Sequence, residues 1–280
     1  MLKHLLLAFV VALPGLAWAA SPERIVSLGG DITETIYALD AQSSLVGVDS
    51  TSEWPISAKA LPDVGYVRQL AAEGVLSLRP QMIIATHDAG PPSVLVQLRS
   101  AGVRIETLPV TYTPDEVVAK VRTIGHLLGK DAAASQLADK IQAQYGELAK
   151  AVAMMPHHPR AAFMMSAGGG SPLLAGNDTA ATHAIALAGG VNAVASYTGY
   201  KPVSAEAMAA LAPDVIVLMR ERADVLGGID GVLKLPGVAL TPAGKARRVI
   251  LVDGQALLGF GPRNAEQELA LQRELAAIGR

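Results

Sequence analysis

The stretch DAAASQLADKIQAQYGELAKAVAMM, residues 131–155, is the longest uninterrupted helical pattern in the sequence. Its larger apolar side chains recur at every third or fourth residue, which is the spacing of one face of an α-helix. They are Leu137, Ile141, Tyr145, Leu148, Val152 and Met155. A helix of this length extends about 37 Å, more than one small domain needs. Because Pro156 and Pro159 then end the pattern, we predict a rigid helix that connects two parts of the chain.

Short apolar runs alternate with helical patterns before this connector. The expected strands are residues 24–28, 45–48, 82–86 and 104–108. Residues 31–34, DITE, form a capping-box pattern that predicts a helix through Leu39. Thr113 as N-cap, with Pro114 and Glu116 after it, predicts a helix that ends near Gly129. This alternation predicts an α/β lobe with a mostly parallel sheet.

A segment of the first half recurs after the connector. Residues 72–85 and 205–218 each contain a Glu, a short helical pattern, a Pro and an apolar run. Further strands are expected at residues 160–165 and 249–252, and a closing helix at residues 265–278. We therefore expect an N-terminal lobe over residues 20–129, a connector helix over 130–157 and a second α/β lobe over 158–280.

The first 19 residues form a secretory signal peptide pattern. A basic start at Lys3 precedes an almost wholly apolar run from Leu5 to Leu16 and an A-x-A cleavage pattern ending at Ala19. The sequence has no Cys, and therefore no lipid-modified cysteine at the cleavage point. Its formal net charge of −2 does not favour nucleic acid as a partner. These features predict an exported periplasmic protein of a Gram-negative bacterium that is not lipid-anchored.

A phenol and a guanidinium stand two residues apart at Tyr66 and Arg68. In an extended backbone such side chains point the same way, roughly 6.5–7 Å apart. The pair is therefore a candidate ligand-binding element. The alternative is a loop tyrosine that packs against the surface of its lobe.

Two α/β lobes joined by a long helix behind a signal peptide resemble the helix-linked periplasmic binding proteins that serve ABC importers of cobalamin, siderophores and haem. Four motifs resemble the haem-binding branch of that family: GYVRQL at 65–70 with AEG at 72–74, HDAGPP at 87–92, GNDTAA at 176–181, and GYKP at 199–202. The resemblance covers the mature chain and implies two Rossmann-like lobes with mostly parallel sheets, with haem bound in the cleft between them. It implies a haem carrier that catalyses no reaction and delivers haem to a permease dimer with its ATPase. An outer-membrane haem receptor system is an indirect partner.

The resemblance places Tyr66 as the axial ligand of ferric haem, a role that suits a hard phenolate oxygen. Arg68 beside it favours the ionised phenol. Some haem-binding relatives have a His where this chain has Ala167, so the sequence favours one haem held by Tyr66 alone. His87 is the alternative iron contact, or a solvated loop histidine.

Other residues are candidates for contacts with the porphyrin. Haem propionates need cations or backbone donors, which Arg68, Lys201 and the loop from Gly168 to Ser171, with Gly169 at its centre, are expected to supply. Tyr197 and Tyr200 are expected to stack on the porphyrin or border it, although surface Lys and Tyr side chains are common without any such role.

Glu73 and Glu206 each lie seven residues before a Pro at equivalent places in the two halves. The resemblance implies that they dock onto arginines of a two-fold transporter. The alternative is that each stabilises the N-terminus of its own helix by about 0.3–1 kcal/mol.

Two other functions remain open from the sequence. One is a siderophore- or cobalamin-binding protein of the same fold. The other is an exported hydrolase, although no nucleophile elbow, Cys nucleophile or H-E-x-x-H pattern is present.

Overall fold

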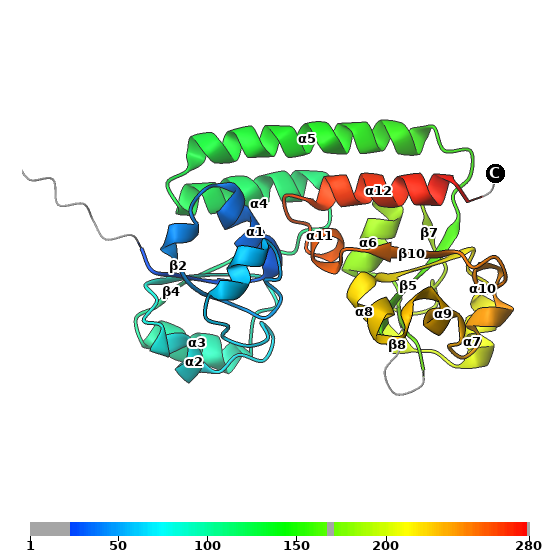
Figure 1. Ribbon diagram of the computed structural model, residues 1–280. Coiled ribbons are helices and arrows are strands. Elements are labelled where there is room, and N and C mark those ends of the chain that lie inside the picture. The colour runs from blue at the N-terminus through cyan, green and yellow to red at the C-terminus, as the bar shows by residue number, and fades with distance from the viewer. Residues whose placement is uncertain (1–22, 167–170, 279–280) are drawn as a thin grey trace, which may run out of the picture.

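The computed structural model describes residues 23–166 and 171–278. Two lobes lie on the same side of a layer of three helices (Figure 1). These helices are α4 (Pro114–Leu127), α5 (Asp131–Ala153) and α12 (Asn264–Ala276). The predicted signal peptide, residues 1–19, lies outside the described residues. None of the described helices combines the length and the apolar character that a membrane crossing needs.

The N-terminal lobe is a four-stranded sheet with helices on both faces. Its strand order is β2-β1-β3-β4, and every neighbouring pair is parallel, as predicted. Ile25 of β1 packs in one core cluster with α1 and α4, and Val26 packs in another with α2 and α3. The elements are β1 (Ile25–Leu28), α1 (Gly30–Ala38), η1 (Gln42–Ser44), β2 (Leu45–Val48), η2 (Ile56–Ala60), α2 (Ala72–Ser77), β3 (Met82–Ala85), α3 (Pro92–Ser100) and β4 (Arg104–Thr107).

The C-terminal lobe has a mixed sheet. Its order is β10-β9-β5-β6-β8, with β7 paired to β5. The elements are β5 (Arg160–Ser166), β6 (Leu173–Ala175), α6 (Ala180–Leu187), β7 (Val191–Asn192), β8 (Tyr200–Pro202), α7 (Ala205–Leu211), β9 (Val215–Met219), α8 (Arg220–Val225), α9 (Gly228–Leu233), η4 (Val238–Leu240), α10 (Pro242–Lys245), β10 (Val249–Val252) and α11 (Gly254–Leu258). Strands β6 and β8 are antiparallel to their neighbours. Neither strand was predicted from the sequence, and the short connection from β5 to β6 leaves no room for the crossover helix of a parallel pair.

The internal repeat is otherwise visible in the strand pairing. The order β2-β1-β3-β4 corresponds to β7-β5-β9-β10, and each of these pairs is parallel. Helix α2 leads into β3 as α7 leads into β9. The two halves are thus related units, as the recurrence of residues 72–85 and 205–218 predicts.

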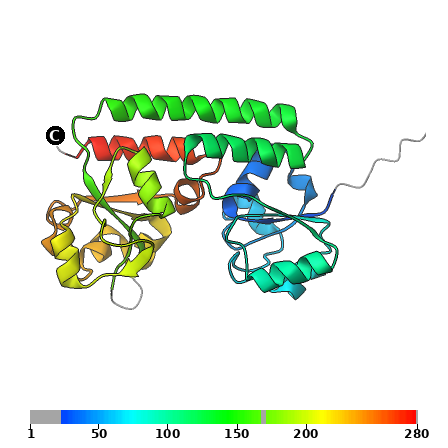
Figure 2. The ribbon, with the colours of Figure 1, turned by 180° about the vertical axis from the view of Figure 1, so that it is seen from behind.

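The three long helices belong to the cores of both lobes. In α5, Ile141, Tyr145 and Leu148 pack in the C-terminal core, whereas Ala134 packs in the N-terminal core. Helix α4 is shared in the same way, because its Val117 lies in the C-terminal core and its Ile124 in the N-terminal core. The chain therefore crosses between the lobes on α4 as well as on the predicted connector, α5 (Figure 2).

A buried polar joint ties α1 of the N-terminal lobe to the C-terminal lobe. Lys120 Nζ is 2.5 Å from Asp31 Oδ2 and donates to the carbonyl of Gly259 at 3.1 Å. Glu34 accepts from the backbone N–H of Arg263 at 2.9 Å and pairs with its guanidinium at 3.0 Å. Burial raises the pKa of Glu34, and Arg263 opposes the shift.

The predicted capping box at residues 31–34 is wrong. Helix α1 begins at Gly30, and its N-cap residue, Gly29, makes no side-chain cap hydrogen bond. Gly29 has a φ of +140°, and a Cβ there would lie 2.4 Å from Thr86 Cγ2. Asp31 and Glu34 serve the joint between the lobes instead, because the tertiary ion pairs are stronger partners than the end of their own helix.

Candidate functional site

Tyr66 and Arg68 contact each other, although their backbone is not the extended segment that the sequence argument assumed. The residues lie in a turn in which the N–H of Gln69 donates to the carbonyl of Tyr66 at 2.8 Å. Arg68 Nη1 donates a hydrogen bond to the Tyr66 phenol oxygen, and the guanidinium carbon lies 5.6 Å from the ring centroid. Tyr66 remains 38% exposed. The turn therefore leaves Tyr66 partly exposed, with its phenol oxygen held against a cation.

The carboxyl end of β3 supplies the next partner of Arg68. Arg68 Nε donates to Asp88 Oδ2 at 2.6 Å, and Thr86 Oγ1 donates to Asp88 Oδ1 at 2.7 Å. Burial alone would raise the pKa of Asp88, but the hydrogen bond from Thr86 and the charge of Arg68 hold it below its usual value. Asp88 is therefore ionised at neutral pH and keeps a charge-assisted contact with Arg68.

Tyr112 lies between these groups and the C-terminal lobe. Its ring stacks on His183 of α6 with the centroids 4.5 Å apart, and meets Phe260 edge-on at 5.5 Å. Burial raises the pKa of Tyr112, the charge of Asp88 adds to the shift, and the charge of Arg68 opposes it. Tyr112 is thus an electrostatic neighbour of the Arg68–Asp88 pair and packs on the opposite lobe.

Tyr200 comes from the C-terminal lobe to the same region. It opens β8 and is 36% exposed. Burial raises the pKa of its phenol, whereas hydrogen bonding with Thr179 and the charge of Arg68 act in the opposite sense. The charge of Arg68 on the N-terminal lobe therefore acts on Tyr112 and on Tyr200 of the C-terminal lobe.

Tyr197 and Lys201 of the C-terminal lobe contact each other. Lys201 Nζ lies 5.2 Å from the Tyr197 ring centroid, and the Tyr197 hydroxyl donates to the carbonyl of Leu174 at 3.3 Å. The ring also packs on Gly176, where a Cβ would approach within 2.4 Å of Tyr197 Cδ2. Tyr197 is therefore held within its own lobe, and the exposed Lys201 is the more available of the two.

The remaining predicted residues lie at exposed positions or outside the described chain. His87 is exposed in the turn after β3, and its charge contributes to the low pKa of Asp88. Glu73 and Glu206 are exposed, and each is the second residue of its helix, α2 and α7. Both helices lie away from the α5 layer (Figure 1). Gly169 and Ala167 lie outside the described residues.

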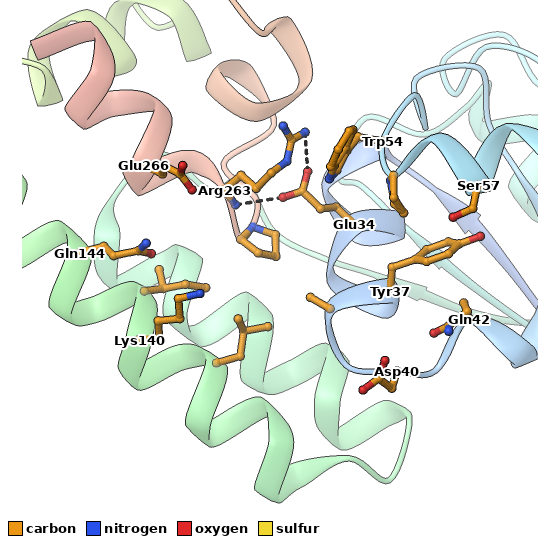
Figure 3. A pocket seen from close by; sticks show the side chains of 15 residues that line it. Glu34, Tyr37, Asp40, Gln42, Trp54, Ser57, Lys140, Gln144, Arg263 and Glu266 are labelled. Atoms are coloured by element: carbon orange, nitrogen blue, oxygen red, sulfur yellow. Dashed lines mark hydrogen bonds and ion pairs between the residues drawn. The ribbon is translucent and has the colours of Figure 1, made fainter. Parts of the chain in front are cut away.

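A separate pocket of about 470 Å³ lies beside α1, α5 and the start of α12 (Figure 3). None of the predicted ligand-binding residues that the structure describes lines it. The Arg263 guanidinium lies 4.7 Å from the ring centroid of Trp54 and also pairs with Glu34. The ring of Trp54 is therefore already covered by the Arg263 guanidinium. We interpret the pocket as part of the joint between the lobes.

The fold has two α/β lobes, with candidate binding residues on both. The sequence pattern of the family described as periplasmic binding protein matches residues 25–256, and the chain belongs to that family. Its members are non-enzymatic transport components, which confirms the prediction that the protein is not an enzyme and excludes the hydrolase. Family membership also implies an ABC transporter as partner and an extracytoplasmic location.

Individual proteins resemble the chain over most of its length. The periplasmic haem-binding protein RhuT from Roseiflexus sp. RS-1, in its apo form, is 38% identical, with a TM-score of 0.88 and coverage of 93% of this chain and 100% of that chain. An uncharacterized ABC transporter substrate-binding lipoprotein, YvrC of Bacillus subtilis (strain 168), is 28% identical over 256 residues, which are 89% of this chain and 79% of YvrC. The vitamin B12-binding protein of Yersinia pestis (strain Pestoides F) is 28% identical over 209 residues, 74% of this chain and 73% of the relative.

Sequence reasoning missed Thr86, Asp88, Tyr112 and His183 as members of this site. Two signals point to them. Ligands of parallel α/β sheets gather at the carboxyl ends of strands, where Thr86 and Asp88 follow β3. The chain has six tyrosines in a composition with only 4% aromatic residues, and four of them, Tyr66, Tyr112, Tyr197 and Tyr200, contribute to this region.

Proposed function

We propose that this protein captures haem between its two lobes and delivers it to an ABC-type importer of the inner membrane. The hydrogen-bonded pair of Tyr66 and Arg68, exposed on the N-terminal lobe, carries the proposal. The solved structures that resemble the chain and are described as periplasmic haem-binding proteins support it.

The chemistry of the pair suits ferric iron. A phenolate is a hard anionic ligand, and the Arg68 guanidinium donates a hydrogen bond to the same oxygen. Ferric iron bound at this oxygen would supply the positive charge that a phenolate ligand needs. Tyr66 is therefore the proposed axial ligand, with His87 as an alternative iron contact.

Other residues of the site have proposed supporting roles. Lys201 and Arg68 are the cations for the haem propionates, with Gly169 as a backbone donor. Tyr200 of the C-terminal lobe, and Tyr112, which packs against that lobe, are proposed to border the porphyrin. Tyr197 contributes less, because its ring and hydroxyl already have partners within its lobe.

Delivery is proposed to use the two exposed glutamates. Glu73 and Glu206 are equivalent residues on the two lobes and would meet the two halves of a permease dimer with its ATPase. We also propose that residues 1–19 direct export to the periplasm and that the mature protein is not lipid-anchored. Residues 20–129, 130–157 and 158–280 are our proposed division into lobe, connector and lobe.

Cobalamin is the second candidate cargo. The resemblance to a vitamin B12-binding protein favours it, and a siderophore is a related possibility within the same fold. Cobalamin already carries nitrogen ligands on its cobalt and has no need of a phenolate. The hydrogen-bonded Tyr66–Arg68 pair therefore favours haem.

Competition binding tests this assignment. The mature protein is titrated with ferric haem and, separately, with cyanocobalamin and a ferric siderophore, and binding is followed by tryptophan fluorescence and calorimetry. We expect haem to bind and an excess of the other two to leave it bound. Saturable binding of cobalamin with no binding of haem would overturn the proposal.

A further inference from the structure

A continuous hydrogen-bonded path joins the end of β3 to the Tyr66 phenol. Thr86 donates to Asp88 Oδ1, Asp88 Oδ2 accepts from Arg68 Nε, and Arg68 Nη1 donates to the phenol oxygen. The path begins on a rigid base, since all residues of β3, Met82–Ala85, are buried between neighbouring strands.

The side chains on this path become more exposed from Asp88 to Arg68. The side chain of Asp88 is 26% exposed and that of Arg68 is 57% exposed. A long, exposed arginine samples many rotamers unless a partner holds it. Asp88 has one oxygen on Thr86 and the other on Arg68, so its orientation fixes the place of the guanidinium.

We propose that Thr86 and Asp88 are positioning residues that hold the Arg68 guanidinium against the Tyr66 oxygen before the cargo arrives. In its consequence for haem, this inference rests on the proposed function. A site with Arg68 already in place would capture ferric haem without first ordering that side chain. The geometry itself is a property of the ligand-free protein and has a test of its own.

The first experiment uses the protein without haem. In ¹⁵N-labelled mature protein, the Arg68 Nε–H signal is expected to exchange with solvent about tenfold more slowly than in Asp88→Ala, because its hydrogen bond to the carboxylate is lost in the variant. Thr86→Ser keeps the hydroxyl and is expected to match the wild type. Thr86→Val keeps the shape without the hydroxyl and is expected to exchange faster. Equal exchange rates in all four proteins would overturn the positioning role.

The second experiment measures the consequence for haem. Ferric haem is loaded, and its transfer to excess apomyoglobin gives the dissociation rate, while the absorption band of the tyrosinate–iron bond is recorded. We expect Thr86→Val and Asp88→Ala to release haem about tenfold faster and to shift the band, and Thr86→Ser to do neither. Asp88→Asn, which keeps an acceptor without the charge, is expected to lie between wild type and Asp88→Ala.

The outcomes separate the two proposals. If the wild type binds haem and all variants match it in release rate and band position, the positioning role is wrong and the proposed function stands. If the wild type binds no haem but shows the slow Arg68 exchange, the proposed function is wrong and the geometry stands. Melting temperatures of all variants show whether a faster release reflects a damaged fold.

Discussion

The partners of several functional and buried side chains come from distant parts of the sequence. Tyr66 and Arg68 contact each other through a turn, and Asp88 contacts Arg68 from the segment after β3.

Glu268 is fully buried on α12, and neither of its carboxyl oxygens has a hydrogen-bond partner within the described residues. Burial raises the pKa of Glu268 well above its ordinary value, so the folded protein favours the neutral acid.

Glu268 is expected to make stability fall as the pH rises. Above the unfolded pKa near 4.5 the unfolded chain releases this proton, whereas the folded protein keeps it until its higher pKa is reached. Each pKa unit of difference costs the folded state about 1.4 kcal/mol. Urea unfolding of the wild type and Glu268→Gln at pH 5 and pH 8 checks this: the variant should gain stability relative to the wild type at pH 8. A constant difference across this range would contradict it.

Elements show which parts of the fold can be predicted from the sequence. The N-caps of α4, α6 and α7, namely Thr113, Thr179 and Ser204, accept hydrogen bonds from their own helices, and each is visible in the sequence because capping is local. The helical period finds α5 for the same reason. The capping box at residues 31–34 fails, because long-range ion pairs engage Asp31 and Glu34. Strands β6 and β8 were not predicted, because each is short and depends on pairing with another strand. The site was found only in part, since Asp88 and Tyr112 join it from separate elements.

The contribution of the joint between α1 and the C-terminal lobe to the free energy of unfolding can be measured. Lys120→Met leaves the Asp31 carboxylate, whose side chain is only 7% exposed, without its cation. The expected loss is about 3–5 kcal/mol in the free energy of unfolding, measured by urea denaturation. The double variant Asp31→Asn with Lys120→Met also removes the unpaired carboxylate charge, and it should recover at least about half of that loss. Equal losses in the single and double variants would contradict a role for the pair.

At the scale of the whole molecule, two related lobes share cores with the same long helices. This construction favours a nearly fixed spacing between α2 on one lobe and α7 on the other. A fixed spacing suits the proposed two-point docking on a symmetric permease, in which Glu73 and Glu206 would act together.

Docking is expected to fail when both glutamates are reversed. With the cognate importer in proteoliposomes, Glu73→Arg with Glu206→Arg should stimulate ATP hydrolysis at least about tenfold less than the wild type, because like charges would face the transporter arginines. Haem binding should be unchanged. Glu147→Arg is the matched control, as Glu147 is exposed on α5 in the helix layer far from α2 and α7. Undiminished stimulation by the double variant would remove these residues from docking.

The absorption spectrum of the ferric haem complex tests the central claim most directly. Wild-type protein should give a high-spin tyrosinate spectrum. Tyr66→Phe, which removes only the ligand oxygen, should abolish that spectrum and weaken binding at least about tenfold, or 1.4 kcal/mol. Tyr37→Phe, which changes a tyrosine beside the pocket of Figure 3, should match the wild type. An unchanged tyrosinate spectrum in Tyr66→Phe would contradict the account.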